Sequence, residues 1–174
     1  MNTLFSLIKS DFIRKRAIYI EDGAQISLIR VMLTDGSSAN VIHRLAFACA
    51  RTKVLSPFAL LFQHINRIYN GCSIGTKANF ADGLALMHPI GVVINSKVVA
   101  GKNITIESGV VIGDEKGLSP SLGDNVFIGA GAKIIGNVTV GNNVKIGANA
   151  VVVKDIPDNC TALGIPAIAR LNER

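Results

Sequence analysis

From Ile74 to Pro157 the sequence repeats with a period of six residues. The clearest run reads IGAGAK, IIGNVT, VGNNVK and IGANAV, in residues 128–151. The first position of a unit is apolar, the second is often Gly, and the fifth is small or aliphatic. Each unit can therefore supply one short strand and one corner, and three units close a triangular coil. Stacked coils pair through parallel hydrogen bonds about 4.8 Å apart, so the repeat predicts a parallel β-helix.

Two units of this repeat are too long. The unit LMHPIGVV (86–93) has two additional residues and contains His88, and IGDEKGLSPS (112–121) has four additional residues. Irregular units of a solenoid usually form loops, and loops carry function. We expect residues 114–121 to project as a loop, and Ser108, one coil further on, to lie over His88.

The segments that flank the repeat have a different pattern. In residues 1–71 apolar residues recur at helical spacing, which predicts three or four short helices. A solenoid needs closed ends, so we expect these helices to cap one end and residues 158–174 to cap the other. The chain thus divides into a helical segment (1–71), a β-helix (72–157) and a C-terminal cap (158–174).

Composition narrows the class of partner. The net charge is +6, but the only basic cluster is FIRKRA (12–17), which is best explained as a solvated helix face. We expect no nucleic-acid partner, and at most a weak peripheral membrane contact through the N-terminal helices. The three cysteines have no paired spacing, and neither a signal peptide nor a spanning segment is evident. These features predict a cytoplasmic protein.

Three segments resemble the serine acetyltransferase family: VIHRLAFACA (41–50), the run from MHPIGVV to GVVIG (87–113), and the run from FIGAGAK to GIPA (127–167). The stretch VVINSKVVAG (92–101) is closest in style to colanic-acid and capsule-type O-acetyltransferases. The resemblance implies a left-handed parallel β-helix, a homotrimer with active sites between subunits, and acetyl-CoA-dependent acetylation of a hydroxyl group.

The family's catalytic histidine matches His88. Imidazole titrates near neutral pH and can take the proton of a hydroxyl that attacks a thioester. The repeat region has one histidine, so we expect no metal site. The resemblance also implies a set of acetyl-CoA contacts, which are Gly113, Ala130, Ala148, Lys154, Pro166 and Arg170.

Several positions depart from the family pattern. Ser73 stands where the family has the aspartate that orients the base, and Met87 stands where it has an aspartate that holds the substrate. Leu118 and Ser119 replace an Arg-His pair. We expect Ser73, Met87 and Ser108 to border the acceptor. The partner of His88 stays open among four candidates, which are Ser73, Asp82, Glu107 and a backbone carbonyl.

These departures favour a saccharide acceptor, because a zwitterionic amino acid needs both an anion and a cation to hold it. The expected function is O-acetylation of a saccharide in exopolysaccharide, capsule or lipopolysaccharide biosynthesis. The alternative is serine O-acetyltransferase, with L-serine as acceptor in cysteine biosynthesis. A remote alternative is a non-catalytic β-helix scaffold.

Overall fold

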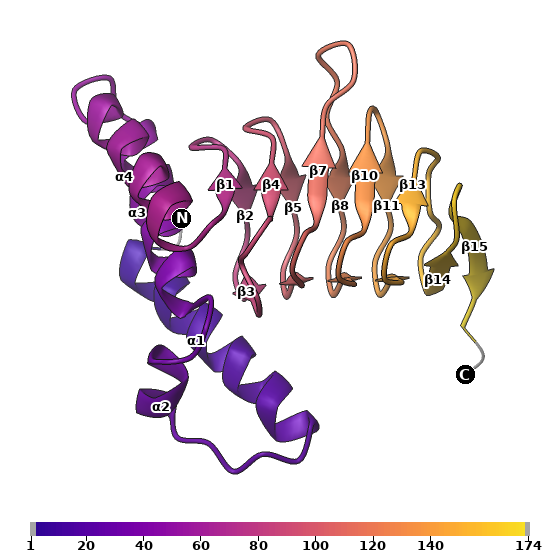
Figure 1. Cartoon of the computed structure of the whole chain (residues 1–174), viewed down its shortest axis with the longest axis horizontal. Coiled ribbons are helices and arrows are strands. Elements are labelled where there is room, and N and C mark those ends of the chain that lie inside the picture. Colours follow the sequence, from indigo (N-terminus) through magenta and orange to yellow (C-terminus); the bar gives the residue numbers. More distant parts are fainter. Residues whose placement is uncertain (1–2, 173–174) are drawn as a thin grey trace.

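The computed structural model describes residues 3–172. Helices form one end of the molecule, and a row of stacked coils leads away from them to the C-terminus (Figure 1). The described helices are α1 (Leu4–Glu21), α2 (Leu28–Met32), α3 (Ser37–Ala50) and α4 (Ser56–Tyr69). Two of their starts follow from local sequence. The side chain of Thr3 accepts the N–H of Ser6 before α1, and Pro57 occupies the first turn of α4.

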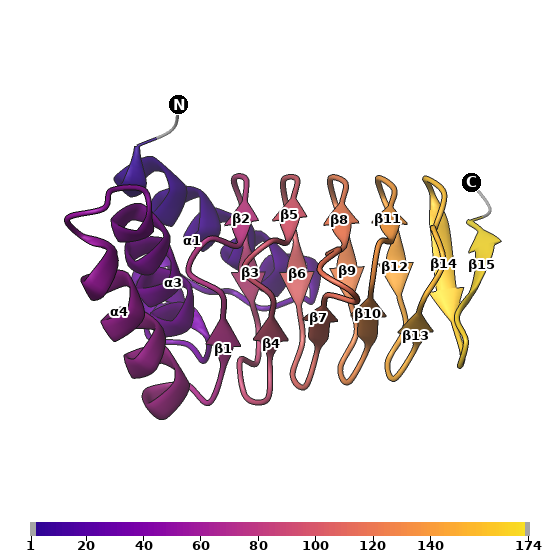
Figure 2. The same cartoon turned by 90° about the horizontal axis from the view of Figure 1, so that it is seen from above.

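Each coil except the last contributes one strand to each of three sheets, and the last coil contributes to only two of them (Figure 2). The first sheet holds β1 (Ser73–Ile74), β4 (Val93–Ile94), β7 (Val111–Gly113), β10 (Lys133–Ile135) and β13 (Val151–Val152). The second holds β2 (Asn79–Phe80), β5 (Val99–Ala100), β8 (Ser121–Leu122) and β11 (Thr139–Val140). The third holds β3 (Ala85–Leu86), β6 (Thr105–Ile106), β9 (Phe127–Ile128), β12 (Lys145–Ile146), β14 (Cys160–Leu163) and β15 (Ile168–Leu171). Neighbouring strands are parallel except for β14 and β15, which are antiparallel.

The core is built mainly from the first and fifth residues of the hexads. In the first sheet a buried row of aliphatic side chains runs through successive coils in register: Ile74, Ile94, Ile112, Ile134 and Val152. Complete burial of one such side chain contributes about 1.5–3 kcal/mol. The predicted architecture, a parallel β-helix behind an N-terminal helical segment, is confirmed.

Both breaks in the repeat appear as changes of register. Ile74 pairs with Ile94, and Ile94 pairs with Ile112, so the coil that contains His88 is two residues longer than the next one. The second break forms the tall loop between β7 and β8 (Figure 1), which covers residues 114–120 because Ser121 already belongs to β8. The amine of Lys97 donates to the carbonyl oxygen of Gly117 at 2.8 Å and ties this loop to the neighbouring coil.

Side chains of the helices form hydrogen bonds with backbone groups at the outer edge of the first coil. Arg44 donates to both carboxylate oxygens of Asp11, at 2.8 and 2.9 Å, and also to the carbonyl oxygens of Phe80 and Ala81. Asp11 in turn accepts the N–H of Leu84 at 2.9 Å. Arg44 and Asp11 are each 1% exposed, and burial raises the pKa of Asp11 while Arg44 opposes that rise. These buried charges satisfy backbone groups that elsewhere pair with a neighbouring coil.

The outward side of α4 is apolar. Phe58, Ile68 and Tyr69 are 53%, 71% and 77% exposed. Within residues 3–172, no helix combines the length and the apolar character needed to cross a bilayer. The weak membrane contact expected from the sequence stays a prediction.

Candidate active site

His88 lies in the corner between β3 and β4, where the register breaks. Up to Met87 the register is regular, because its N–H donates to the carbonyl oxygen of Ile106 at 3.0 Å. The regular pattern resumes at Ile90, whose carbonyl oxygen accepts the N–H of Gly109 at 2.9 Å. The additional residues therefore lift His88 out of the stack, and its side chain is 60% exposed.

Asp35 is the partner of His88. Its Oδ2 lies 3.1 Å from Nδ1 of the imidazole. Asp35 belongs to the short turn between α2 and α3, 53 residues earlier in the chain. If Asp35 accepts a hydrogen bond from Nδ1–H, then Nε2 keeps a free lone pair and can accept a proton. This is the arrangement that a general base requires.

Two of the side-chain partners considered from the sequence, Ser73 and Asp82, line other pockets. Ser73 borders a small pocket beside His64 and Arg67 of α4. Asp82 borders another pocket at the corner between the second and third sheets. Glu107 lies one coil beyond Met87. Asp35 was missed because DGSS (35–38) resembles an ordinary turn before a helix, and no spacing in the sequence connects it to His88.

Ser108 lies next to the break but is aligned with Ile90. Its carbonyl oxygen accepts the N–H of Gly131 at 2.7 Å, and the corresponding carbonyl in the coil before is that of Ile90. The expectation that Ser108 lies over His88 therefore needs correction, because the two additional residues displace His88 from the row.

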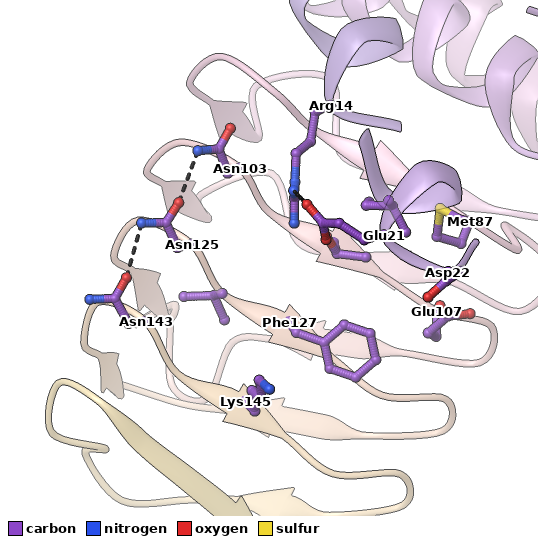
Figure 3. A pocket seen from close by; sticks show the side chains of 13 residues that line it. Arg14, Glu21, Asp22, Met87, Asn103, Glu107, Asn125, Phe127, Asn143 and Lys145 are labelled. Carbon is purple, nitrogen blue, oxygen red and sulfur yellow. Dashed lines mark hydrogen bonds and ion pairs between the residues drawn. The ribbon is translucent and has the colours of Figure 1, made fainter. Parts of the chain in front are cut away.

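A pocket of about 640 Å³ reaches this corner between the C-terminal half of α1 and the outer face of the third sheet (Figure 3). Met87 and Glu107 line the part next to His88, and Figure 3 shows Asp22 at the same end. Arg14 contributes a cation and pairs with Glu21 at 3.3 Å. The pocket thus contains both carboxylates and a guanidinium among its lining residues.

The far wall of the pocket is a row of asparagines. The amides of Asn103, Asn125 and Asn143 are hydrogen-bonded in series at 2.9 and 3.0 Å (Figure 3). All three residues have a left-handed backbone, with φ of 56–57°, a conformation that asparagine tolerates better than most residues. Because their side chains bond to one another, this wall is best explained as a structural ladder.

Three of the predicted acetyl-CoA contacts lie along the corner that continues from His88. Ala130 and Ala148 are exposed on consecutive coils, and a Cβ added to Gly129 would lie 2.7 Å from the nitrogen of Ala148, so the coils touch here. Pro166 lies in the turn between β14 and β15, which the N–H of Val151 holds through the carbonyl oxygen of Gly164 at 3.0 Å.

The other three predicted contacts lie elsewhere on the same protomer. Gly113 ends β7, and Lys154 follows β13, so both lie at the corner between the first and second sheets. Arg170 is exposed on β15 in the third sheet. At the corner that continues from His88, the small side chains of Ala130 and Ala148 leave space for a pantetheine arm beside the backbone. One protomer does not bring all six predicted contacts together.

Comparisons with known proteins place the chain among acyltransferases. The model of the bacterial transferase hexapeptide (six repeats) matches residues 119–154. The serine acetyltransferase of Synechococcus elongatus is 36% identical over 168 residues, which cover 94% of this chain and 67% of that protein. This chain therefore spans about two thirds of the length of that relative.

Solved structures agree with the sequence comparison. Neisseria gonorrhoeae serine acetyltransferase in complex with serine superposes with a TM-score of 0.85 at 33% identity, covering 95% of this chain and 68% of that one. A serine acetyltransferase in complex with CoA superposes with a TM-score of 0.86 at 27% identity, covering 96% of this chain and 69% of that one.

These relatives overturn the prediction of a saccharide acceptor. That prediction was wrong, because near-complete coverage by serine acetyltransferases supports the alternative reading. The expected closeness to colanic-acid and capsule-type enzymes is likewise not supported. The resemblance to the serine acetyltransferase family is confirmed, as is the wider class, an acyltransferase of the hexapeptide-repeat type. With 36% identity over nearly its whole length, and with the same fold, the chain belongs to the serine acetyltransferase family.

Proposed function

We propose that this protein is a serine O-acetyltransferase that transfers the acetyl group of acetyl-CoA to the hydroxyl of L-serine. The observation that carries the proposal is the Asp35–His88 pair, with Nδ1 and Oδ2 3.1 Å apart. The residue before His88, Met87, borders a pocket that contains both carboxylates and a guanidinium. The family membership of the chain supports the same activity.

His88 is the general base in this scheme. Its Nε2 takes the hydroxyl proton of serine while the hydroxyl oxygen attacks the thioester carbonyl carbon. A C–O bond forms and the C–S bond breaks, and the proton passes from His88 to the departing sulfur. Asp35 keeps the imidazole in the required tautomer and stabilises the imidazolium that forms in between.

The pocket contains charged groups of both signs, which a zwitterionic acceptor needs. Their apparent absence from the sequence had favoured a saccharide acceptor. Met87 cannot hold an ammonium group, but Glu107 on the adjacent coil borders the same end of the pocket, and so does Asp22. Arg14 is the candidate partner of the serine carboxylate. In this proposal the anion has moved from one coil to its neighbour, where position-by-position comparison with the family does not find it.

The placement of the acetyl-CoA candidates supports a homotrimer. Ala130, Ala148 and Pro166 continue the corner of His88, whereas Gly113 and Lys154 lie at a different corner of the triangular cross-section. A co-substrate that contacts both sets would lie between two protomers, which a closed ring of three identical subunits provides. Arg170 and Lys154 are the candidate phosphate contacts.

The test is thiol release from acetyl-CoA in the presence of L-serine, nucleotide sugars or capsule oligosaccharides. We expect L-serine to be preferred, and His88→Ala to lose about 10²- to 10⁴-fold in turnover while staying folded. The matched control is His64→Ala, on the exposed side of α4, which should keep wild-type turnover. A preference for a saccharide, or unchanged turnover in His88→Ala, would contradict the proposal.

A further inference from the structure

Lys15 is buried where α1, the turn between α2 and α3, and the end of β3 meet. Its residue is 1% exposed. The ammonium group donates to the carbonyl oxygen of Asp35, to the carbonyl oxygen of Leu86 at 3.0 Å and to Oγ of Ser37 at 3.3 Å. These bonds use all the donors that a lysine has.

The two carbonyl groups belong to the two sides of the Asp35–His88 pair. One is the carbonyl of the residue that carries the carboxylate. The other belongs to Leu86, two residues before the imidazole. A single ammonium group therefore joins the backbone of the turn to the backbone of the catalytic strand, directly behind the hydrogen bond between the side chains.

Gly36 shows how closely the turn lies against the strand. It has a left-handed backbone with φ of 76°, and an added Cβ would lie 2.1 Å from the carbonyl oxygen of Leu86 and 3.3 Å from Nζ of Lys15. Only glycine allows this approach without a shift of the backbone. The position of Asp35 is thus defined by two contacts to Leu86, one through Gly36 and one through Lys15.

The Asp35–His88 pair needs such support. Its side chains are 53% and 60% exposed, and exposed ion pairs are weak because water screens them and the side chains lose rotational freedom. We propose that Lys15 is a positioning residue, which holds Asp35 against His88 and thereby keeps the imidazole in the tautomer required for base catalysis. This inference rests on the role of His88 in the proposed function.

The charge of Lys15 makes the arrangement sensitive to pH. Burial lowers the pKa of Lys15 from 10.5 to about 8, against the opposing effects of Asp35 and Glu107, which face the ammonium group. Asp11, one helical turn earlier, is bound to Arg44. Above about pH 8 the amine keeps only two N–H donors and no charge, so the hold on Asp35 should weaken as pH rises.

The first test observes His88 without any turnover. Ring-¹⁵N NMR distinguishes the Nδ1–H from the Nε2–H tautomer, and the chain has only three histidines, which His64→Gln and His88→Gln would assign. We expect the Nδ1–H form to dominate in the wild type and to become the minor form in Lys15→Met, Lys15→Gln and Asp35→Asn. Lys9→Met, an exposed substitution on the same helix, should match the wild type.

The second test is kinetic. Lys15→Gln should lower kcat about 10- to 100-fold, the effect of a small misplacement of a catalytic group, with little change in KM for either substrate. The wild type should lose activity and Nδ1–H tautomer together as pH rises past about 8, and the variant should lose this alkaline limb.

Either of two results would overturn the inference: a folded Lys15 variant with the wild-type tautomer, or a wild-type tautomer ratio that stays constant while the Lys15 ammonium, followed through its own Nζ resonance, loses its proton. The second measurement needs no variant, so it decides the question even if both substitutions prevent folding. If L-serine does not stimulate turnover, the proposed function fails, but the tautomer measurement still tests the role of Lys15.

Discussion

The two ends of the solenoid are closed in different ways. At the N-terminal end, buried side chains of α1 and α3 bond the free backbone groups of the first coil, with Arg44, Asp11 and Asn40 among them. At the C-terminal end, β15 turns back and pairs antiparallel with β14, so the closing bonds come from the backbone itself. The N-terminal closure depends on particular side chains, whereas the C-terminal closure depends mainly on the reversal of the backbone at β15.

This difference explains where a site could arise. The N-terminal closure brings a second segment of the chain, with its own ionisable groups, against the coil that contains His88. Asp35 and Lys15 are both part of that contact. In the part of the C-terminal closure that the structure describes, Ile168 and Leu171 are exposed, and so is the charged residue Arg170.

The largest expected effect breaks the N-terminal closure. Arg44→Met would leave the Asp11 carboxylate buried without its partner, and should cost about 3–5 kcal/mol in the free energy of unfolding. Urea denaturation measures it. The matched control is Arg16→Met, an exposed arginine on α1, for which we expect a change within about 0.5 kcal/mol. Equal effects of the two substitutions would remove the contrast between buried and exposed charges.

A smaller effect at the same end depends on pH. His43 is buried against Phe80, and burial lowers its pKa to about 3 from 6.5, with Arg44 adding to the shift. Between these values the unfolded chain binds a proton that the folded chain does not, so stability is present above pH 6.5 and falls as pH decreases toward 3. The expected slope is about 1.4 kcal/mol per pH unit.

Urea denaturation between pH 7 and 4 checks this slope for His43. In His43→Leu the contribution should disappear, leaving a flatter profile than that of the wild type. A wild-type slope that persists unchanged in His43→Leu would assign the acid sensitivity to other groups.

The smallest expected effect is at the C-terminal end. Arg170→Ala, on the exposed strand β15, should change the free energy of unfolding by no more than about 0.5 kcal/mol. If Arg170 contacts a phosphate of acetyl-CoA, the same variant should raise KM for acetyl-CoA and leave KM for serine unchanged. A large loss of stability here would show that the two ends do not differ as described.

The repeat was predictable because each hexad carries the same local information. Ile94, Ile112 and Ile134 occupy equivalent positions, and pairing them in register buries all three. His88 was also predictable as an exception to that pattern. Asp35 was not, because it lies in a short turn of the helical segment, where no periodicity relates it to the β-helix.

The acceptor was predicted wrongly for the same reason, because residues that are distant in the sequence meet only in the folded chain. Met87 was compared with an aspartate at the same sequence position, and its presence argued against an amino acid. In the structure, the neighbouring coil places Glu107 at the same end of the pocket, α1 adds Arg14, and the C-cap of α1 adds Asp22. A charge lost at one position can be supplied by a residue that is adjacent only in space.

The sequence by itself determined the β-helix, its two interruptions and the exposed histidine, because a period of six sets strand, corner and burial locally. Only the tertiary structure decided which carboxylate meets His88 and how Lys15 is buried behind it. Those contacts join α1, the turn at Asp35 and the end of β3. They depend on how the helices close the first coil, and closure at an end has no repeat from which to predict it.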